Sequence, residues 1–231
     1  MQVVINKNKD EELRKMKKLT LFSILLLACG AMSFAQNDNR VELFGGYSYE
    51  SINSGITGPD VPDFTGTSLD KRFNTNGFNV AGTRYFTKRL GITADFSANY
   101  QSRNDVFDSE ETRSKLSLYN ITAGPQFRFS NASRFTPFVH GLAGVAHRNQ
   151  RETFTDTTES NFGTTFVKDK GTSFALNLGG GVDYRLNDRF ALRILQVDYN
   201  PIFLGSRTID TVALPSQTLN GFRFSTGIVI K

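Results

Sequence analysis

The stretch GITADFSANY, residues 91–100, decides the fold because it contains two interleaved rows of side chains. Successive side chains of a β-strand point to opposite faces, so the stretch predicts a strand with one apolar face and one polar face. In a soluble sheet the apolar face contacts the core, whereas in a membrane barrel it contacts lipid and the polar face lines the interior. The apolar row is Ile92, Ala94, Phe96, Ala98 and Tyr100, and the polar row is Thr93, Asp95, Ser97 and Asn99.

The N-terminal segment has the three-part layout of a secretory signal. MKKLTLFSILLLACGAMSFAQ, residues 16–36, has a basic start, an apolar run and small residues at Ser33 and Ala35. We expect residues 1–35 to be a signal peptide cleaved after Ala35, which leaves residues 36–231 as the exported domain. The apolar run is too short for a convincing transmembrane helix.

Two alternatives remain open at this end of the chain. The signal begins either at Met1 or at Met16, because the residues before Met16 add nothing that a signal needs. The box LLAC, residues 26–29, also loosely resembles a lipoprotein signal, which would leave a lipidated Cys29 at the new N-terminus. Cys29 is the only cysteine, so an exported domain starting after Ala35 is expected to contain no disulfide.

The charge balance changes when the signal is set aside. Residues 1–35 hold six of the 27 Lys and Arg residues and three of the 22 Asp and Glu residues. The remaining chain therefore has 21 basic and 19 acidic side chains, in place of the formal net charge of +5. This near balance removes the main support for a nucleic-acid partner, and we expect none.

Alternating segments recur along the exported domain and predict eight strands. Most are close to the roughly 10 residues that a tilted strand needs to cross a bilayer. Outside the signal, no segment approaches the ~18 consecutive apolar residues of a membrane helix. The predicted strands are 40–50, 77–86, 91–100, 115–129, 135–147, 173–186, 190–199 and 221–231.

The connections between these segments alternate strictly between long and short. Such alternation is expected of a barrel whose two ends face different compartments, with short turns on the periplasmic side and long loops outside. The fold class that we predict is therefore all-β, an eight-stranded antiparallel up-and-down transmembrane β-barrel. The long connections are polar, which fits a solvated rim or an outward-facing contact surface. The long connections are 51–76, 101–114, 148–172 and 200–220, and the short ones are 87–90, 130–134 and 187–189.

The polar rows contain charged residues that would lie inside such a barrel. An eight-stranded barrel has an interior that side chains just fill, and a buried charge is tolerated there when it is paired. Arginine suits this pairing because its guanidinium can bridge two carboxylates. We predict a structural lumen charge network; the alternative is an open sheet whose charges contact solvent. The predicted members are Glu42, Asp95, Arg128, Asp183, Arg185, Arg193, Asp198 and Arg223.

The segment FALRILQVDY, residues 190–199, departs from simple alternation. Arg193 and Gln196 cannot share one face of a regular strand. One extra residue at Ile194–Leu195, a β-bulge, would return both side chains to the lumen together with Asp198. The fifth predicted segment has two mixed rows, so the pattern assigns His140 to neither face.

Aromatic residues near the ends of the predicted strands support a lipid-facing wall. Tyrosine and phenylalanine gather at the membrane–water interfaces of such barrels, although β-propensity alone explains part of this enrichment. The absence of tryptophan weakens the interfacial argument without removing it. The residues concerned are Tyr47, Tyr49, Phe86, Tyr100, Phe127, Phe129, Phe135 and Tyr199.

The domain resembles the small OmpA/OmpX-like barrels, in the family called outer membrane protein beta-barrel domain. The resemblance is carried by VELFGGYSY at 41–49, the hairpin at 77–100, TPFVHGLAGVAH at 136–147, the segment 178–199 and GFRFSTGIVIK at 221–231. It implies the outer membrane of a Gram-negative-type bacterium, with outer-membrane lipid and the barrel-assembly machinery as partners. Members of the family include membrane-stabilising and adhesion proteins.

Three functions remain open. The first is a structural or surface-interaction barrel, a monomer whose long loops meet a surface or envelope protein partner. The second is a narrow pore or a small-ligand carrier. The third is a lipid-modifying enzyme, for which His140 and His147 are the only histidines and no serine motif flanks them. We expect no catalytic residues, cofactor or metal, since two histidines without a cysteine cannot make a usual closed zinc site.

Overall fold

The computed structural model describes residues 41–53, 72–107, 110–129, 133–156, 163–209, 212–214 and 216–231. All regular structure in these residues is β-strand. None of the residues so described belongs to a helix that could span a membrane. The predicted signal peptide and the Cys29 alternative lie outside the described residues.

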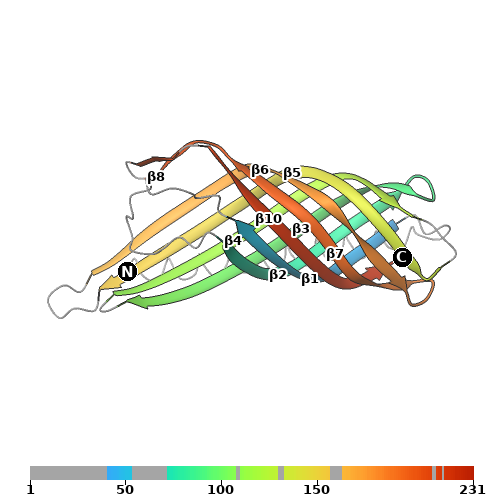
Figure 1. Cartoon of the computed structure of the whole chain (residues 1–231), viewed down its shortest axis with the longest axis horizontal. Helices are drawn as coiled ribbons and strands as arrows, with labels where there is room; N and C mark the ends of the chain where they lie inside the picture. Colours follow the sequence, from blue (N-terminus) through green and yellow to red (C-terminus); the bar gives the residue numbers. More distant parts are fainter. Residues whose placement is uncertain are drawn as a thin grey trace, which may run out of the picture. The chain divides into compact units, whose positions relative to one another are not determined.

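Eight long strands close into an antiparallel barrel, which confirms the predicted fold class (Figure 1). Each strand pairs with its neighbours in the chain, and β1 closes the cylinder by pairing with β10. A separate short hairpin, β8 Arg207–Ile209 with β9 Val212–Leu214, precedes the last strand. The barrel strands are β1 Val41–Asn53, β2 Arg72–Tyr85, β3 Leu90–Phe107, β4 Glu110–Arg128, β5 Phe135–Asp156, β6 Gly163–Arg185, β7 Phe190–Leu204 and β10 Gln217–Ile230.

The two rows of residues 91–100 face opposite sides of the wall, as the alternation predicts. Asp95 is 3% exposed in the interior, whereas Ile92 is 52% exposed on the outer surface. The other strands repeat this arrangement, for example at Asn177 inside and Phe174 outside on β6. A continuous apolar outer surface is what a hydrocarbon environment requires of a membrane barrel.

The predicted β-bulge in β7 is confirmed. In the pairing of β6 with β7, Val182 is opposite Leu195 and Asp183 is opposite Arg193, so Ile194 has no partner in this register. Both Ile194 and Leu195 are consequently exposed on the outer surface. The register shift returns the next inward positions to the lumen, as the break in the sequence pattern required.

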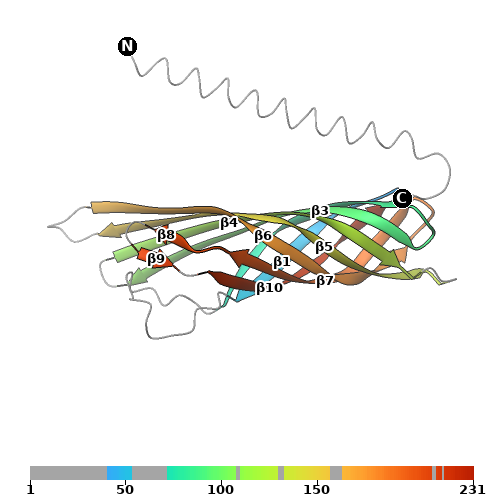
Figure 2. The ribbon, with the colours of Figure 1, turned by 90° about the horizontal axis from the view of Figure 1, so that it is seen from above.

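The prediction that 101–114 and 148–172 are loops was wrong, because most of these residues belong to strands. β3 and β4 pair continuously to Phe107 and Glu110, and β5 and β6 pair to Asp156 and Gly163. Figure 2 shows β4, β5 and β6 extending past the ends of β1 and β10. The extensions are polar on both faces, so the period-two signal that marks a lipid-facing strand is missing there.

Glycines allow the backbones of neighbouring strands to approach closely. A Cβ atom at Gly77 on β2 would lie 1.8 Å from the carbonyl oxygen of Ala98 on β3. A Cβ atom at Gly46 on β1 would lie 2.1 Å from the carbonyl oxygen of Thr226 on β10. Glycine in a strand interior often marks such close backbone approach, and here it permits the strong curvature of a small barrel.

We predict that Gly77→Val destabilises the barrel by about 1–3 kcal/mol, because the new side chain overlaps the β3 backbone. The matched control is Gly171→Val, since nothing lies within 4 Å of a Cβ atom at Gly171 on β6. Urea unfolding of both variants in lipid vesicles measures the difference. Equal stability of the two variants would contradict the close-approach argument.

Candidate functional site

Arg223 of β10 lies at the centre of the polar lumen and bridges two carboxylates. Its Nη1 donates to Asp95 Oδ1 of β3 at 2.8 Å, and its Nη2 donates to Asp198 Oδ2 of β7 at 2.8 Å. Its Nε also donates to Asp198 Oδ2, at 3.1 Å. All three side chains are almost completely removed from solvent. The pairing satisfies three buried charges at once, which is the condition for keeping them there.

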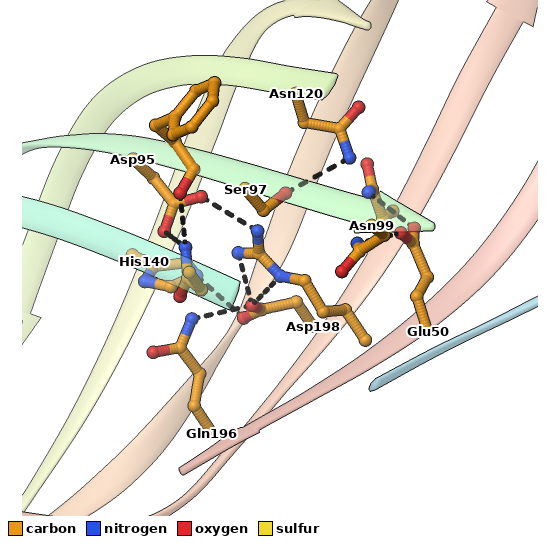
Figure 3. A network of polar contacts seen from close by, with 12 residues as sticks. Glu50, Asp95, Ser97, Asn99, Asn120, His140, Gln196 and Asp198 are labelled. Carbon is orange, nitrogen blue, oxygen red and sulfur yellow. Dashed lines mark hydrogen bonds and ion pairs between the residues drawn. The ribbon is translucent and has the colours of Figure 1, made fainter. Parts of the chain in front are cut away.

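His140 of β5 joins this cluster from another wall. Its Nε2 lies 2.8 Å from Asp198 Oδ1, and Gln196 Nε2 donates to Asp198 Oδ2 at 2.7 Å (Figure 3). Asn79 of β2 donates to Asp95 Oδ2 at 2.9 Å. Side chains from four strands therefore converge on two carboxylates. The lumen position of His140, which the sequence pattern did not assign, follows from this contact.

Glu50 is a second carboxylate centre, nearer the long-loop end of β1. It is 0% exposed, and its two oxygens accept hydrogen bonds of 2.8 Å from Asn99 Nδ2 and Asn200 Nδ2. The neighbouring Asn120 Nδ2 donates to Ser97 Oγ at 3.4 Å (Figure 3). A buried carboxylate that accepts two amide hydrogen bonds keeps both of its oxygens satisfied.

Two further ion pairs lie toward the short-turn end. Arg193 Nε donates to Asp183 Oδ1 at 2.8 Å, and the Arg193 guanidinium stacks on the rings of Phe44 and Phe138 at 4.3 and 4.2 Å from their centroids. Such stacking is a favourable cation–π geometry.

The second of these ion pairs joins β4 to β1. Arg128 Nη1 donates to Glu42 Oε1 at 2.7 Å, and the Arg128 guanidinium lies 3.9 Å from the centroid of the Tyr85 ring. Tyr85 in turn accepts a hydrogen bond of 2.7 Å from Gln126 Nε2. The pair is therefore held by an aromatic ring as well as by charge, and it extends the polar lumen to the short-turn end of the barrel.

Seven of the eight predicted network residues are thus placed in three ion-paired groups. The exception is Arg185, which is exposed at the end of β6, one residue before the turn begins. At that position the strand leaves the closed part of the wall, so a long side chain reaches solvent although its row faces inward.

The sequence prediction of the lumen network did not include Glu50, although the sequence contains a pattern that places it in the lumen. Glu50 has the same parity as Glu42 on the same strand, so the two side chains share a face. Asn99, its partner, likewise shares the row of Asp95. No sequence signal could show that these residues meet, because β1 and β3 come together only across the closed lumen.

Apolar side chains of the inward row pack together on both sides of the polar centre. The inward row therefore contains apolar as well as polar side chains. On the long-loop side lies an apolar layer formed by Ile52, Leu118, Ala146, Ala175, Ile202, Leu204 and Leu219, against which Phe73 packs. On the short-turn side lies a smaller apolar layer of Phe44, Ala191 and Val229, with Ala81 against it.

The polar side chains of the lumen are held to one another by ion pairs and hydrogen bonds. The histidine–aspartate contact resembles part of a catalytic relay, but His140 is 8% exposed and lies between the two apolar layers. Within the described part of the chain, no group of three or more His, Cys, Asp and Glu side chains could hold a metal ion. A site with these properties ties strands together and fills space.

Comparisons with known proteins place the chain by family and by fold. The family model named outer membrane protein beta-barrel domain matches residues 21–212. No protein with a curated description matches the chain in sequence.

Several solved structures are similar. The attachment invasion locus protein Ail of Yersinia pestis is 18% identical with a TM-score of 0.44, and the match covers 82% of this chain and 97% of that one. Neisserial surface protein A is 13% identical with a TM-score of 0.45, with 84% and 97% covered. OprG of Pseudomonas aeruginosa is 14% identical with a TM-score of 0.38, with 82% and 94% covered.

We predict that Arg223→Met destabilises the barrel by about 3–5 kcal/mol, because it leaves Asp95 and Asp198 buried without their cation. The matched control is Arg185→Met, an exposed arginine, which should change stability by less than about 0.5 kcal/mol. Unfolding in urea, followed by tyrosine fluorescence in lipid vesicles, measures both. A loss at Arg223 no larger than the loss at Arg185 would refute the central role of the cluster.

Proposed function

The chain belongs to the outer membrane protein beta-barrel domain family, whose barrels lie in the Gram-negative outer membrane, and we propose that it is a sealed barrel with a surface-interaction role. In this proposal the wall and lumen form a rigid, non-conducting scaffold. The long-loop end, with its projecting strands, meets partners outside the cell. The observation that carries the proposal is the closed lumen.

The packing of the lumen supports a sealed scaffold. Arg223, the largest of the fully buried side chains, occupies the centre, and the layer that contains Ile52 and Leu219 covers it on the long-loop side. An ion crossing the barrel would have to separate buried ion pairs and then pass a cluster of apolar side chains. Both steps are costly in a low-dielectric interior.

The projecting part of the wall supports the surface role. Beyond Tyr100, β3 pairs with β4 alone, and before Phe174, β6 pairs with β5 alone, as far as the described residues extend. β3 to β6 therefore continue past the closed barrel as a four-stranded sheet with two lateral edges. Sheet edges present unpaired backbone groups that can accept a strand from a partner.

The positions of the two histidines favour a non-enzymatic role over a lipid-modifying one. His140 is held by Asp198 inside the lumen, where lipid has no access. His147 is exposed on β5, and its Nδ1 lies 2.9 Å from Thr172 Oγ1 on β6. Among the described residues neither histidine is hydrogen-bonded to a serine, so neither forms the nucleophile–base pair of an acyl hydrolase.

The alternative of a narrow pore is tested by conductance. We expect the refolded protein to give no stable channel steps in a planar lipid bilayer, because the polar centre and both apolar layers fill the lumen. A water-filled porin inserted in the same bilayer is the positive control. Large, stable steps from this chain would overturn the sealed scaffold.

The surface role is tested by trimming the projecting hairpin of β5 and β6. Arg151 and Lys168 are register partners, so residues 151–168 can be removed and an Asn-Gly turn placed between Gln150 and Asp169. We expect the trimmed protein to remain heat-modifiable on gels, whereas cells that display it should aggregate and attach to glass less than cells displaying the full chain.

The control for this trimming replaces residues 151–168 with 18 Gly and Ser residues, which keeps the length of the connection but removes the strands. The replacement should behave like the deletion if the projecting sheet carries the contact. Attachment equal to that of the full chain in both variants would remove this hairpin from the proposed function.

A further inference from the structure

The short turns carry a repeated pattern that the lumen and the projecting sheet do not explain. In each of the three turns an arginine directly precedes the apolar residue that begins the next strand. The pairs are Arg89–Leu90 before β3, Arg134–Phe135 before β5 and Arg189–Phe190 before β7. Three separate turns thus place the same two side-chain types in the same order at the same end of the barrel.

Backbone hydrogen bonds hold the three arginines at equivalent positions. The carbonyl oxygen of each accepts a bond from a backbone N–H on the next hairpin or the last strand. These bonds are Arg128 N to Arg89 O at 2.8 Å, Arg185 N to Arg134 O at 2.8 Å and Lys231 N to Arg189 O at 2.9 Å. The backbone ladder of the wall therefore fixes the position of each arginine along the barrel axis. Because the three hydrogen bonds occupy equivalent places in the ladder, we infer that the three arginines lie at the same depth in the membrane boundary.

Polar side chains in the turns fix the apolar residues in the same way. Leu90 N donates to Thr87 Oγ1 at 2.9 Å, and Phe190 N donates to Asn187 Oδ1 at 2.8 Å. Phe135 N donates to Ser133 Oγ at 2.9 Å. Each arginine–apolar pair is thus anchored through both of its backbone groups, which leaves the side chains free to project.

Both members of each arginine–apolar pair are exposed at the short-turn end of the wall. Leu90, Phe135 and Phe190 are 46%, 48% and 41% exposed on the outer surface. The three arginines, each of which directly precedes one of these residues in the chain, are also exposed, and no ion pair to a described residue is formed by any of the three. A cationic side chain next to a lipid-facing apolar residue is in the position of an interfacial anchor.

The whole short-turn end is strongly basic. Arg84, Lys88 and Arg185 are also exposed there, whereas the described exposed acid at this end is Asp188. Arg84 lies in the outer row of β2, opposite Val41 and Ile92, which are both exposed apolar residues. An excess of cations at a membrane boundary attracts anionic headgroups.

We propose that the three turn arginines form a binding ring for the phosphate groups of anionic glycerophospholipids in the periplasmic leaflet. Short turns of outer-membrane barrels lie on the periplasmic side. Each guanidinium can donate two parallel hydrogen bonds to a phosphate while the adjacent Leu or Phe contacts the acyl chains. The equivalent depth of the three pairs matches a planar layer of headgroups better than it matches a compact acidic protein. This inference requires a membrane barrel and is independent of the proposed surface role.

The test compares lipid selectivity of the full chain with that of R89Q/R134Q/R189Q in phosphatidylcholine vesicles. Spin-labelled phosphatidylglycerol and phosphatidylcholine report, by electron paramagnetic resonance, which lipid associates with the protein. We expect the full chain to select phosphatidylglycerol over phosphatidylcholine by about fivefold. This factor corresponds to the ~1 kcal/mol that one basic residue contributes at an anionic surface. The triple variant should lose this selectivity, and ~1 M salt should weaken it in the full chain.

Three controls decide the result. The variant R72Q/K115Q/K170Q removes the same charge from exposed positions at the long-loop end and should keep the selectivity. R89K/R134K/R189K preserves the charge and should keep most of it. Because the backbone groups of the arginines, not their side chains, hold the turns, all variants should keep the heat-shifted band of the folded barrel.

Three results would overturn the proposal. The first is unchanged phosphatidylglycerol selectivity in R89Q/R134Q/R189Q, and the second is an equal loss in R72Q/K115Q/K170Q. Binding of soluble polyglutamate by the full chain, without lipid selectivity, would assign the basic end to an acidic protein partner and would equally overturn it.

Discussion

The structure depends on one constraint: eight strands enclose a space that only side chains can fill, and charges in that space must find partners across it. Backbone hydrogen bonds join each strand only to its two neighbours. Arg223 of β10 reaches Asp95 on β3, although β10 is hydrogen-bonded through its backbone to β1 and β7 and not to β3. Glu50 of β1 likewise reaches Asn99 on β3 and Asn200 on β7. These contacts tie together strands that are not neighbours in the barrel, which the backbone ladder alone cannot do.

A lumen filled in this way leaves chemistry to the surfaces of the barrel. The polar centre lies between two apolar layers, and the sealed scaffold that we propose rests on this packing. The two ends also differ in kind. Among the described residues, the long-loop end continues as a four-stranded sheet whose two lateral edges have no strand partner, and the short-turn end displays three exposed arginines at equivalent positions of the ladder. A single rigid wall therefore supports two surfaces that face different environments.

Much of the fold could be predicted from the sequence, because lipid and a narrow lumen both impose a period of two on every strand that crosses the membrane. The same logic located the bulge at Ile194–Leu195, since one extra residue is the smallest change that restores the faces. It failed for 101–114 and 148–172, because both rows of these segments are mostly polar in sequence and no alternation marks them as strand.

The sequence by itself determined the strands of the membrane-crossing wall, their order and the row to which each charged residue belongs, since all of these follow from side-chain parity. Only the tertiary structure decided which charges meet. The partners of Arg223 are 128 and 25 residues away in the chain, and they become neighbours when the barrel closes. It also decided that Arg185 lies outside the lumen and that His140 and Glu50 lie inside it. The physical reason is that parity assigns a side chain to a face, whereas depth along the barrel and position around it depend on the register of every strand in between.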